Sequence, residues 1–328
     1  MFCRRKIVFI GVTMGDPNGV GPEIILNSFR KGETGKDFVV IGDYQVMDFC
    51  SRLLKYQVPL KKIVNLSQWE KGRLNILDLG LLEEKDIEIG KVSSKAGFAA
   101  QKYVERATLM ALDGKVSALV TLPVNKKAIR LTDPTFTGHT EFIAQLCGQS
   151  NYAMMLTSEK LKVVHVTTHI PLTEVAKFIK KNRVVEVTTL AGEAMQMLLG
   201  RKPKIAISGF NPHAGEDGAF GREEIEEIIP AVEEVRSKNW EVAGPISPDV
   251  VFLEAYRGKY DVVIAMYHDQ GHIPVKLLDF EGGVNVTLGL KIVRTSVDHG
   301  TAFDIAYKGV ANIKSFVQAF DLAEKLSK

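Results

Sequence analysis

Six of the seven histidines lie in segments typical of strand ends or of loops rich in glycine and proline. These segments are GHTE (138–141), THIP (168–171), NPHAGEDGAFG (211–221), YHDQGHIP (267–274) and DHGTAFD (298–304). Strand ends are where α/β folds place binding groups, and neutral imidazole is a good ligand for Zn, Co or Ni. The pattern favours a histidine-lined site, although a structural role for each histidine stays open. The seventh, His165 in VVHVT, is expected to be a core histidine.

His268 and His272 stand four residues apart, as do the two histidines of the HExxH motif of zinc proteases. The residue after His268 is Asp269, where such a protease carries Glu. Gly271 and Pro274 are expected to interrupt the helix that this motif requires. The sequence therefore argues against a metalloprotease.

Three further polar residues could hold an anion or another polar ligand. Arg294 lies in the β-rich run KIVRTS (291–296), where a charge needs a partner. An arginine at the end of a strand suits bidentate binding of a phosphate or carboxylate. Lys276 could act with it or be an ordinary solvated group, and Asn285 could supply a polar contact or belong to a turn.

The segment GDPNGVGPEI (15–24) connects a predicted strand to a predicted helix, and Pro22 is well placed for the first helical turn. Its backbone N–H groups could face an anion. The spacing of its glycines is not GxGxxG, and no acidic residue follows where the Rossmann pattern demands one. A tight turn capped by Asp16 or Asn18 is the simpler interpretation.

The composition is that of an ordinary globular protein. The chain has 328 residues, of which 45% are hydrophobic and 25% charged, and a net charge of +3. This charge indicates neither a nucleic-acid nor a membrane-surface partner, and no run approaches the length of a membrane span. Three scattered cysteines favour a reducing compartment. The apolar run 7–12, after Arg4, Arg5 and Lys6, is interpreted as a core strand and not a signal peptide, so a cytoplasmic location is expected.

The elements that must position the polar residues alternate between strand and helix. Short β-rich runs recur at 6–14, 38–42, 74–80, 117–122, 160–168, 204–210, 261–267 and 291–296. Apolar residues recur at helical spacing over 95–113, and charges over 222–238 suit a helix that Pro230 kinks or breaks. The alternation predicts an α/β fold with a largely parallel sheet. Because no linker divides the chain, two interleaved domains are expected.

Several segments together resemble blocks of the 4-hydroxythreonine-4-phosphate dehydrogenase family. They are GDPNGVGPEI, GHTEFIA, TTHIPL, NPHAGEDGAFGREE, GPISPDVVF, AMYHDQG and NVTLGLKIVRTSVDHGTAFDIA, within residues 8 to about 315. The last block is also similar to one of isopropylmalate dehydrogenases. The resemblance implies an isocitrate/isopropylmalate dehydrogenase-like α/β fold with two interleaved domains, 1–133 with 289–328 and 134–288. The active site would lie in the cleft between them.

The resemblance also implies roles for individual residues. The family's ligands for one divalent metal (Zn, Co or Mg), one of them from the partner subunit of a homodimer, match His169, His213 and His268. The substrate-binding positions match His139, Thr140, Lys276, Asn285 and Arg294. The residues expected to border a NAD or NADP site are His299, Gly300, Thr301 and Ala302. Candidate acid–base groups are Asp249 and Asp269.

The implied reaction oxidises and decarboxylates 4-(phosphooxy)-L-threonine to 3-amino-2-oxopropyl phosphate and CO2, in pyridoxal phosphate biosynthesis. Hydride passes to the nicotinamide, and a metal at the substrate hydroxyl would stabilise the alkoxide and then the enolate. However, GHIP (271–274) and AFDIA (302–306) are more similar to a branch that acts on 4-phospho-D-threonate or 4-phospho-D-erythronate. There the same chemistry yields dihydroxyacetone phosphate and CO2.

Two other functions remain open. A zinc-dependent hydrolase could use the three histidines with an aspartate as base. A non-catalytic sugar-phosphate-binding protein could use the same polar residues without turnover. Tyr307, where many relatives have Gly, leaves the details of the cofactor contacts open.

Overall fold

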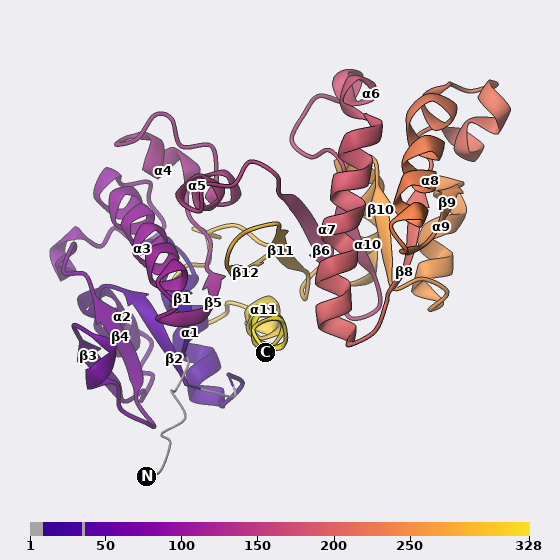
Figure 1. Ribbon diagram of the computed structural model, residues 1–328. Helices are drawn as coiled ribbons and strands as arrows, with labels where there is room; N and C mark the ends of the chain where they lie inside the picture. Colours follow the sequence, from indigo (N-terminus) through magenta and orange to yellow (C-terminus); the bar gives the residue numbers. More distant parts are fainter. Residues whose placement is uncertain (1–8, 35–36) are drawn as a thin grey trace, which may run out of the picture. The chain divides into compact units, whose positions relative to one another are not determined.

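The computed structural model describes residues 9–34 and 37–328, which form two compact units (Figure 1). Unit 1 contains the described residues up to 150 together with 290–328, and unit 2 contains 151–289. The chain therefore leaves unit 1 once and returns to it. Residues 134–150, which the sequence assigned to the second domain, lie in unit 1 because helix α5 (His139–Leu146) packs against α3 (Ser94–Leu112).

Unit 1 is built on parallel strands in the order β3-β4-β2-β1-β5-β12. The strands are β1 (Phe9–Thr13), β2 (Phe38–Gly42), β3 (Leu60–Ile63), β4 (Leu74–Asp78), β5 (Val116–Thr121) and β12 (Val293–Val297). The remaining helices are α1 (Gly21–Lys31), α2 (Tyr44–Leu53), α4 (Lys126–Arg130) and α11 (Lys314–Leu326), with short 3-10 turns at η1 (Leu66–Gln68) and η2 (Glu84–Asp86). Strands β1 and β2 are buried at every position, as expected for parallel strands covered on both faces.

Helix α3 confirms the helical spacing predicted over 95–113. Its buried face carries small alanines, which allow close packing, and its largest residue is Tyr103. The Tyr103 hydroxyl donates a 2.6 Å hydrogen bond to the carboxylate of Asp43, which lies at the carboxyl end of β2. A buried polar group needs such a partner, so this bond fixes α3 against the sheet.

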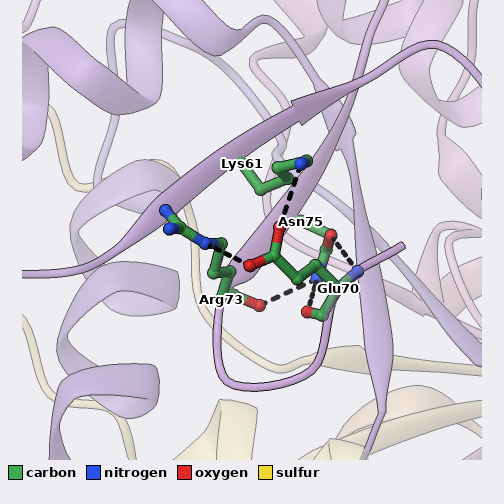
Figure 2. A network of polar contacts seen from close by, with 4 residues as sticks. All are labelled: Lys61, Glu70, Arg73 and Asn75. Atoms are coloured by element: carbon green, nitrogen blue, oxygen red, sulfur yellow. Dashed lines mark hydrogen bonds and ion pairs between the residues drawn. The ribbon is translucent and has the colours of Figure 1, made fainter. Parts of the chain in front are cut away.

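The turn between β3 and β4 is held by a polar network at the edge of unit 1 (Figure 2). Asn75 is buried on β4; its amide donates to the carbonyls of Glu70 and Arg73 and accepts from the Glu70 N–H. On the outside, Lys61 and Arg73 contact the Glu70 carboxylate at 2.9 and 2.7 Å, and these ion pairs lower the pKa of Glu70. The buried amide is the stronger constraint, because exposed ion pairs contribute little in water.

Unit 2 has strands in the order β11-β6-β7-β10-β8-β9, in which β6 is antiparallel to both of its neighbours. The strands are β6 (Ala153–Thr157), β7 (Lys162–His165), β8 (Lys204–Ser208), β9 (Glu241–Ile246), β10 (Val262–Ala265) and β11 (Val284–Leu288). The helices are α6 (Val175–Phe178), α7 (Lys181–Leu199), α8 (Ile229–Ser237), α9 (Pro248–Tyr256) and α10 (His268–Leu278), with η3 (Leu172–Glu174), η4 (Pro212–Gly218) and η5 (Glu224–Ile228).

The α/β class and the largely parallel pairing are confirmed, and two local predictions have opposite outcomes. Pro230 marks a break as predicted, because it lies in the first turn of α8, directly after the π-helical turn η5. The expectation that Gly271 and Pro274 interrupt the helix after His268 is wrong, because α10 runs from His268 to Leu278 with Pro274 inside it.

Two findings bear on the expected environment of the chain. Cys50 and Cys147 are buried free thiols, whereas Cys3, the basic residues 4–6 and the start of the predicted strand 6–14 lie outside the described residues. Within 9–34 and 37–328, no helix combines the length and the apolar character that crossing a bilayer requires.

Candidate functional site

A pocket of about 470 Å³ opens in unit 2 at the carboxyl ends of β7 and β10. These two strands pair in parallel, so the loops that follow them leave the same edge of the sheet. The polar residues that line the pocket are Thr168, His169, Tyr267, His268 and Asp269. The carboxyl edge of a parallel sheet is the usual position of a binding site.

The pocket contains two of the predicted metal ligands. The ring centroids of His169 and His268 lie 5.8 Å apart. The Nδ1 of His268 lies 2.6 Å from the Oδ1 of Asp269. Because a carboxylate only accepts hydrogen bonds, it places the imidazole proton on Nδ1 and leaves the lone pair on Nε2. A carboxylate that orients a histidine in this way is typical of metal-ligating histidines.

His213, the third predicted ligand, lies on a different loop of unit 2, after β8. Its ring contacts Phe220, with centroids 6.1 Å apart, and its charge acts on Asp249. Within the described residues of this single chain, no three histidine, cysteine, aspartate or glutamate side chains are grouped to hold a metal ion. The three-histidine site therefore stays a prediction, of which one chain assembles the pair His169 and His268.

The loop that carries His213 has an unusual backbone. Residues 213–217 all have positive φ angles between 41° and 83°, and only Gly215 among them is a glycine. Left-handed backbone costs L-residues roughly 1–2 kcal/mol each. The buried carboxylate of Glu224 opposes this strain, because it accepts from the N–H groups of Phe210 and Asn211, both at 2.7 Å, and from the Asn211 amide. Such strain is characteristic of functional loops.

Asp249 lies in the first turn of α9 and is exposed. The Ser247 hydroxyl donates to it at 2.5 Å, and this bond lowers the pKa of Asp249. A carboxylate of this kind stays ionised at neutral pH and is a weak base. Its predicted acid–base role, like that of Asp269, is not tested by the structure.

Unit 1 holds a second group of predicted site residues around a buried arginine. Arg294 is 2% exposed on β12. Its guanidinium donates to the Thr121 hydroxyl at 2.8 Å and approaches the Thr140 hydroxyl at 3.5 Å. Burial lowers the pKa of Arg294 to about 10, against the opposing effect of Glu141, so the group is cationic at neutral pH. These hydroxyl contacts do not neutralise its charge.

His139 begins α5, next to Thr140. Its Nε2 is buried and has no hydrogen-bond partner. Burial, followed by the charges of Arg294 and Lys126, lowers the pKa of His139 to about 3, so the ring is neutral. A buried polar nitrogen without a partner is uncommon in proteins and indicates a position where a ligand group can bind.

The segment GDPNGVGPEI forms a buried turn and not an open anion site. Asp16 caps the turn by accepting from the Asn18 N–H at 2.9 Å, as the simpler interpretation predicted. Burial raises the pKa of Asp16 to about 6. Gly21 allows the close approach, since a Cβ there would lie 2.1 Å from the Met14 carbonyl oxygen. The Val20 N–H donates to the carbonyl of Thr301, so the turn supports the predicted cofactor segment.

The predicted cofactor segment forms a loop in unit 1 after β12. His299 and Gly300 are exposed, and Ala302 has a φ of 42°. Tyr307 also has a positive φ, 59°, a backbone conformation that glycine adopts more readily than other residues. Here the buried Tyr307 hydroxyl donates to the Pro17 carbonyl at 2.6 Å and holds the loop against the turn.

The two remaining substrate candidates lie in unit 2. Lys276 lies on α10, with its ammonium 5.1 Å from the centroid of the Phe280 ring. Asn285 lies in strand β11 and not in a turn, and its Oδ1 is buried without a hydrogen-bond partner.

Sequence reasoning missed two residues and one contact at these sites. Lys126 was not singled out, because a lysine on a short exposed helix looks like a solvated group. Gln270 is buried, accepts from the Met266 N–H and donates to the Gly209 carbonyl, so it ties α10 to β8. The contact of His272 with the core residue His165, at 3.1 Å, joins residues that no local pattern connects.

Acidification should reveal the neutral state of His139. Its folded pKa of about 3 lies below the ordinary 6.5, so below pH 6.5 only the unfolded chain binds the proton. The stability that neutral His139 contributes above pH 6.5 is thus lost as the pH falls toward 3.

We expect the stability difference between wild type and His139→Asn to shrink by about 2 kcal/mol from pH 7 to pH 4.5. Urea unfolding at each pH measures this difference, and the titration of groups common to both proteins cancels. A stability difference that does not change between pH 7 and pH 4.5 would contradict a buried neutral imidazole. Above pH 7.5 the stability difference should be constant.

The chain matches known proteins over nearly its whole length. The family model described as "Pyridoxal phosphate biosynthetic protein PdxA" matches residues 34–323. The D-threonate 4-phosphate dehydrogenase of Pectobacterium atrosepticum is 44% identical over 322 residues, which cover 97% of this chain and 99% of the relative. The 4-hydroxythreonine-4-phosphate dehydrogenase of Aquifex aeolicus is 41% identical over 317 residues, with 97% and 98% covered.

A solved structure gives the same result. The 4-hydroxythreonine-4-phosphate dehydrogenase from Klebsiella pneumoniae matches with a TM-score of 0.90 and 43% identity, over 98% of this chain and all of that chain. The resemblance predicted from the sequence segments is therefore confirmed, and the chain belongs to the PdxA family of dehydrogenases.

Proposed function

We propose that this chain is a NAD(P)- and divalent-metal-dependent oxidative decarboxylase of a phosphorylated 3-hydroxy acid. The buried Arg294 cation, flanked by the unpartnered Nε2 of His139, is the observation that carries the proposal. A cation held in the protein interior beside the hydroxyls of Thr121 and Thr140 suits an anionic group of a ligand.

The substrate that we favour is 4-phospho-D-threonate, with 4-(phosphooxy)-L-threonine as the second candidate. Relatives carrying both names cover almost the whole chain, at 44% and 41% identity. The segments GHIP and AFDIA, which differ from the second group, support the first. The two substrates differ in a 2-hydroxyl or 2-amino group, while the oxidised carbon, the carboxylate and the phosphate are the same.

The metal proposal depends on the donor set of the pocket. His169 and His268 bring two imidazole rings together, and the hydrogen bond of Asp269 to Nδ1 of His268 leaves the Nε2 of that ring for a ligand. We propose that three histidines hold one divalent ion: His169, His268 and His213. One of the three comes from the partner subunit. When bound, the ion would act as a Lewis acid toward the substrate hydroxyl. Three imidazoles accept Zn or Co readily, and Mg less so.

Five polar side chains are the proposed substrate-binding groups. In unit 1, Arg294 and the Thr140 hydroxyl would bind one anionic group, and neutral His139 would donate or accept at its buried nitrogen. Lys276 on α10, as a cation, and Asn285 on β11, as an acceptor, are the other two proposed substrate contacts. Fixing both ends of a flexible acid orients its hydroxyl carbon for hydride transfer.

The nicotinamide cofactor would bind beside residues 299–302. A Cβ at position 300 would meet no atom of the described residues within 4 Å, so their packing does not require a glycine there. The close approach of a ligand would require one. Asp249 and Asp269 remain the proposed acid–base candidates. Asp269 holds the proton on Nδ1 of His268, which makes the orientation of that ring its more direct role.

A homodimer is part of the same proposal. Three large apolar side chains are exposed along α10 and just after it. They are Ile273, Leu277 and Phe280, with 63%, 85% and 76% of their surfaces accessible. Large apolar side chains exposed together typically mark a protein interface. A second copy of this chain is the expected occupant, because a metal ligand from a partner subunit requires one.

The reaction is tested by comparing 4-phospho-D-threonate, 4-phospho-D-erythronate and 4-(phosphooxy)-L-threonine with NAD or NADP and with Zn, Co or Mg. We expect reduced nicotinamide with release of CO2, and kcat/KM about tenfold or more higher for the preferred acid. Chelation should abolish the rate and added metal restore it. Phosphate release without nicotinamide reduction would indicate a hydrolase, and ligand binding without turnover a binding protein.

A His139→Ala enzyme tests the anion site of unit 1. Loss of a hydrogen bond to a charged group typically costs 1.5–3 kcal/mol, so KM for the phosphorylated substrate should rise by about 10- to 100-fold. Lys127→Ala, which removes an exposed cation from the neighbouring helix α4, should leave KM unchanged. An unchanged KM in His139→Ala would remove His139 from the anion site.

The dimer is tested with Leu277→Glu, which places a charge on the most exposed apolar residue of α10. Light scattering with size-exclusion chromatography should show the mass falling from two chains to one, since burying a charge in an apolar interface is unfavourable. Val64→Glu, at an exposed apolar residue of unit 1, is the control and should stay dimeric. A dimeric Leu277→Glu would exclude this face as the interface.

A further inference from the structure

Four histidines of unit 2 form one cluster: His165, His169, His268 and His272. The rings of His268 and His272 are stacked, with centroids 3.6 Å apart and planes inclined by 12°. The ring of His165 lies 4.7 Å from that of His272 and 6.3 Å from that of His268. His272 thus lies between a buried core histidine and a predicted metal ligand.

The hydrogen bonds of the cluster define the protons on its rings. The Nδ1 of His165 lies 3.2 Å from the Met154 carbonyl oxygen, which only accepts, so this nitrogen carries the proton. Burial lowers the pKa of His165 to about 3, so the ring is neutral and its Nε2 carries the lone pair. The Nδ1 of His272, 3.1 Å from that Nε2, must therefore be the donor. It also lies 3.1 Å from the His268 carbonyl oxygen, a second acceptor.

The backbone permits this contact only with glycine at position 271. A Cβ there would lie 2.4 Å from the Nε2 of His165 and 2.6 Å from a methyl group of Val163. Gly271 therefore lets α10 approach β7 closely enough for His272 to reach His165. The helix that carries both His268 and His272 is held against the core through this pair.

The anchor that His272 provides differs in strength from that of Asp269. The Asp269 side chain is 71% exposed, and a hydrogen bond at such a position competes with water. His165 is 1% exposed and cannot move without disturbing the core. The face of His268 that meets His272 is thus held by a partner anchored in the core, and the edge that meets Asp269 by an exposed one.

We propose that His272 is a positioning residue of the metal centre: stacked on His268 and anchored to His165, it holds the His268 ring in its ligating orientation. This inference rests on the proposed role of His268 as a metal ligand. His272 itself contacts no metal in this proposal. A ligand whose orientation is fixed before binding loses less conformational freedom when the metal arrives.

The test measures metal affinity of the full-length, metal-free protein, by competition for Zn²⁺ and Co²⁺ with a chromophoric chelator. His272→Leu removes the donor and the aromatic ring, and we expect affinity to fall about 10- to 100-fold, as for other partners of metal-ligating histidines. His272→Asn keeps an N–H donor near the position of Nδ1 and should retain most of the affinity.

Two controls separate positioning from a general loss of stability. Thr188→Val removes a buried hydrogen bond on α7, from the Thr188 hydroxyl to the Val184 carbonyl, without touching the cluster, and should bind metal like wild type. The double variant His165→Leu/His272→Leu should lose no more affinity than His272→Leu alone, because both changes remove one contact. All measurements are made well below the melting temperature of each variant.

The outcomes distinguish the inference from the function on which it rests. If wild type binds metal and His272→Leu binds it equally well, His272 does not position the ligand. If wild type itself binds neither Zn²⁺ nor Co²⁺, the metal centre is wrong and this inference falls with it. A measurement on wild type alone also tests the proposal. In the NMR spectrum of ¹⁵N-histidine-labelled protein, ring nitrogen signals that show an Nδ1–H tautomer of His272 support it, and an Nε2–H tautomer overturns it.

Discussion

The parallel pairing of β7 with β10 is the constraint on which the histidine pocket depends. The register places His165 opposite Ala265, so that the two strands end together and the loops after them leave the sheet side by side. One loop carries His169 and the other begins α10 with His268. A shift of this register would separate the two imidazoles and would also move His165 away from His272. The chemistry of the pocket is therefore a consequence of strand pairing, not of local sequence spacing.

The two units bury polar side chains in different charge states. In unit 2 the buried imidazole of His165 is neutral, and the ring Nδ1 atoms of His165, His268 and His272 lie beside a carbonyl, a carboxylate and another imidazole. Neutral ligands leave the charge of a bound cation undiminished. In unit 1, Arg294 keeps its charge in the interior with hydroxyl partners. A buried cation of this kind is unfavourable for folding alone, which is why an anionic ligand is its natural complement.

Much of the fold could be predicted from the sequence, because long apolar patterns record burial. Strand β2 and helix α3 were located within a residue or two. Strands β3, β6, β9 and β11 were not predicted; for β3 and β9 the burial pattern is only partial, so no run of apolar residues marks them. A turn was one of the two interpretations of Asn285, whereas this residue lies in β11, paired antiparallel with β6. That pairing joins distant segments and leaves no local signal.

The candidate site was predictable to a different degree. Residue types and family blocks located the loops, but the proton on each ring depends on partners such as Met154 and Asp269, and these are set by tertiary packing. The left-handed backbone around His213 is equally invisible, since alanine, glutamate and aspartate rarely adopt it.

Helix α10 shows how tertiary contacts override a local rule. A proline inside a helix removes one hydrogen bond and costs about 3 kcal/mol, and Gly271 adds a further penalty of roughly 1 kcal/mol. The sequence therefore predicted an interruption. The compensating contacts are the two hydrogen bonds of the Gln270 side chain, the burial of Val275 and the His272–His165 pair. Gly271 weakens the helix locally, but its lack of a side chain leaves room for His165. The same residue therefore allows the His272–His165 contact that fixes the helix. A helix that survives only through such contacts is held in one position, which is the property that a metal ligand at its first residue requires.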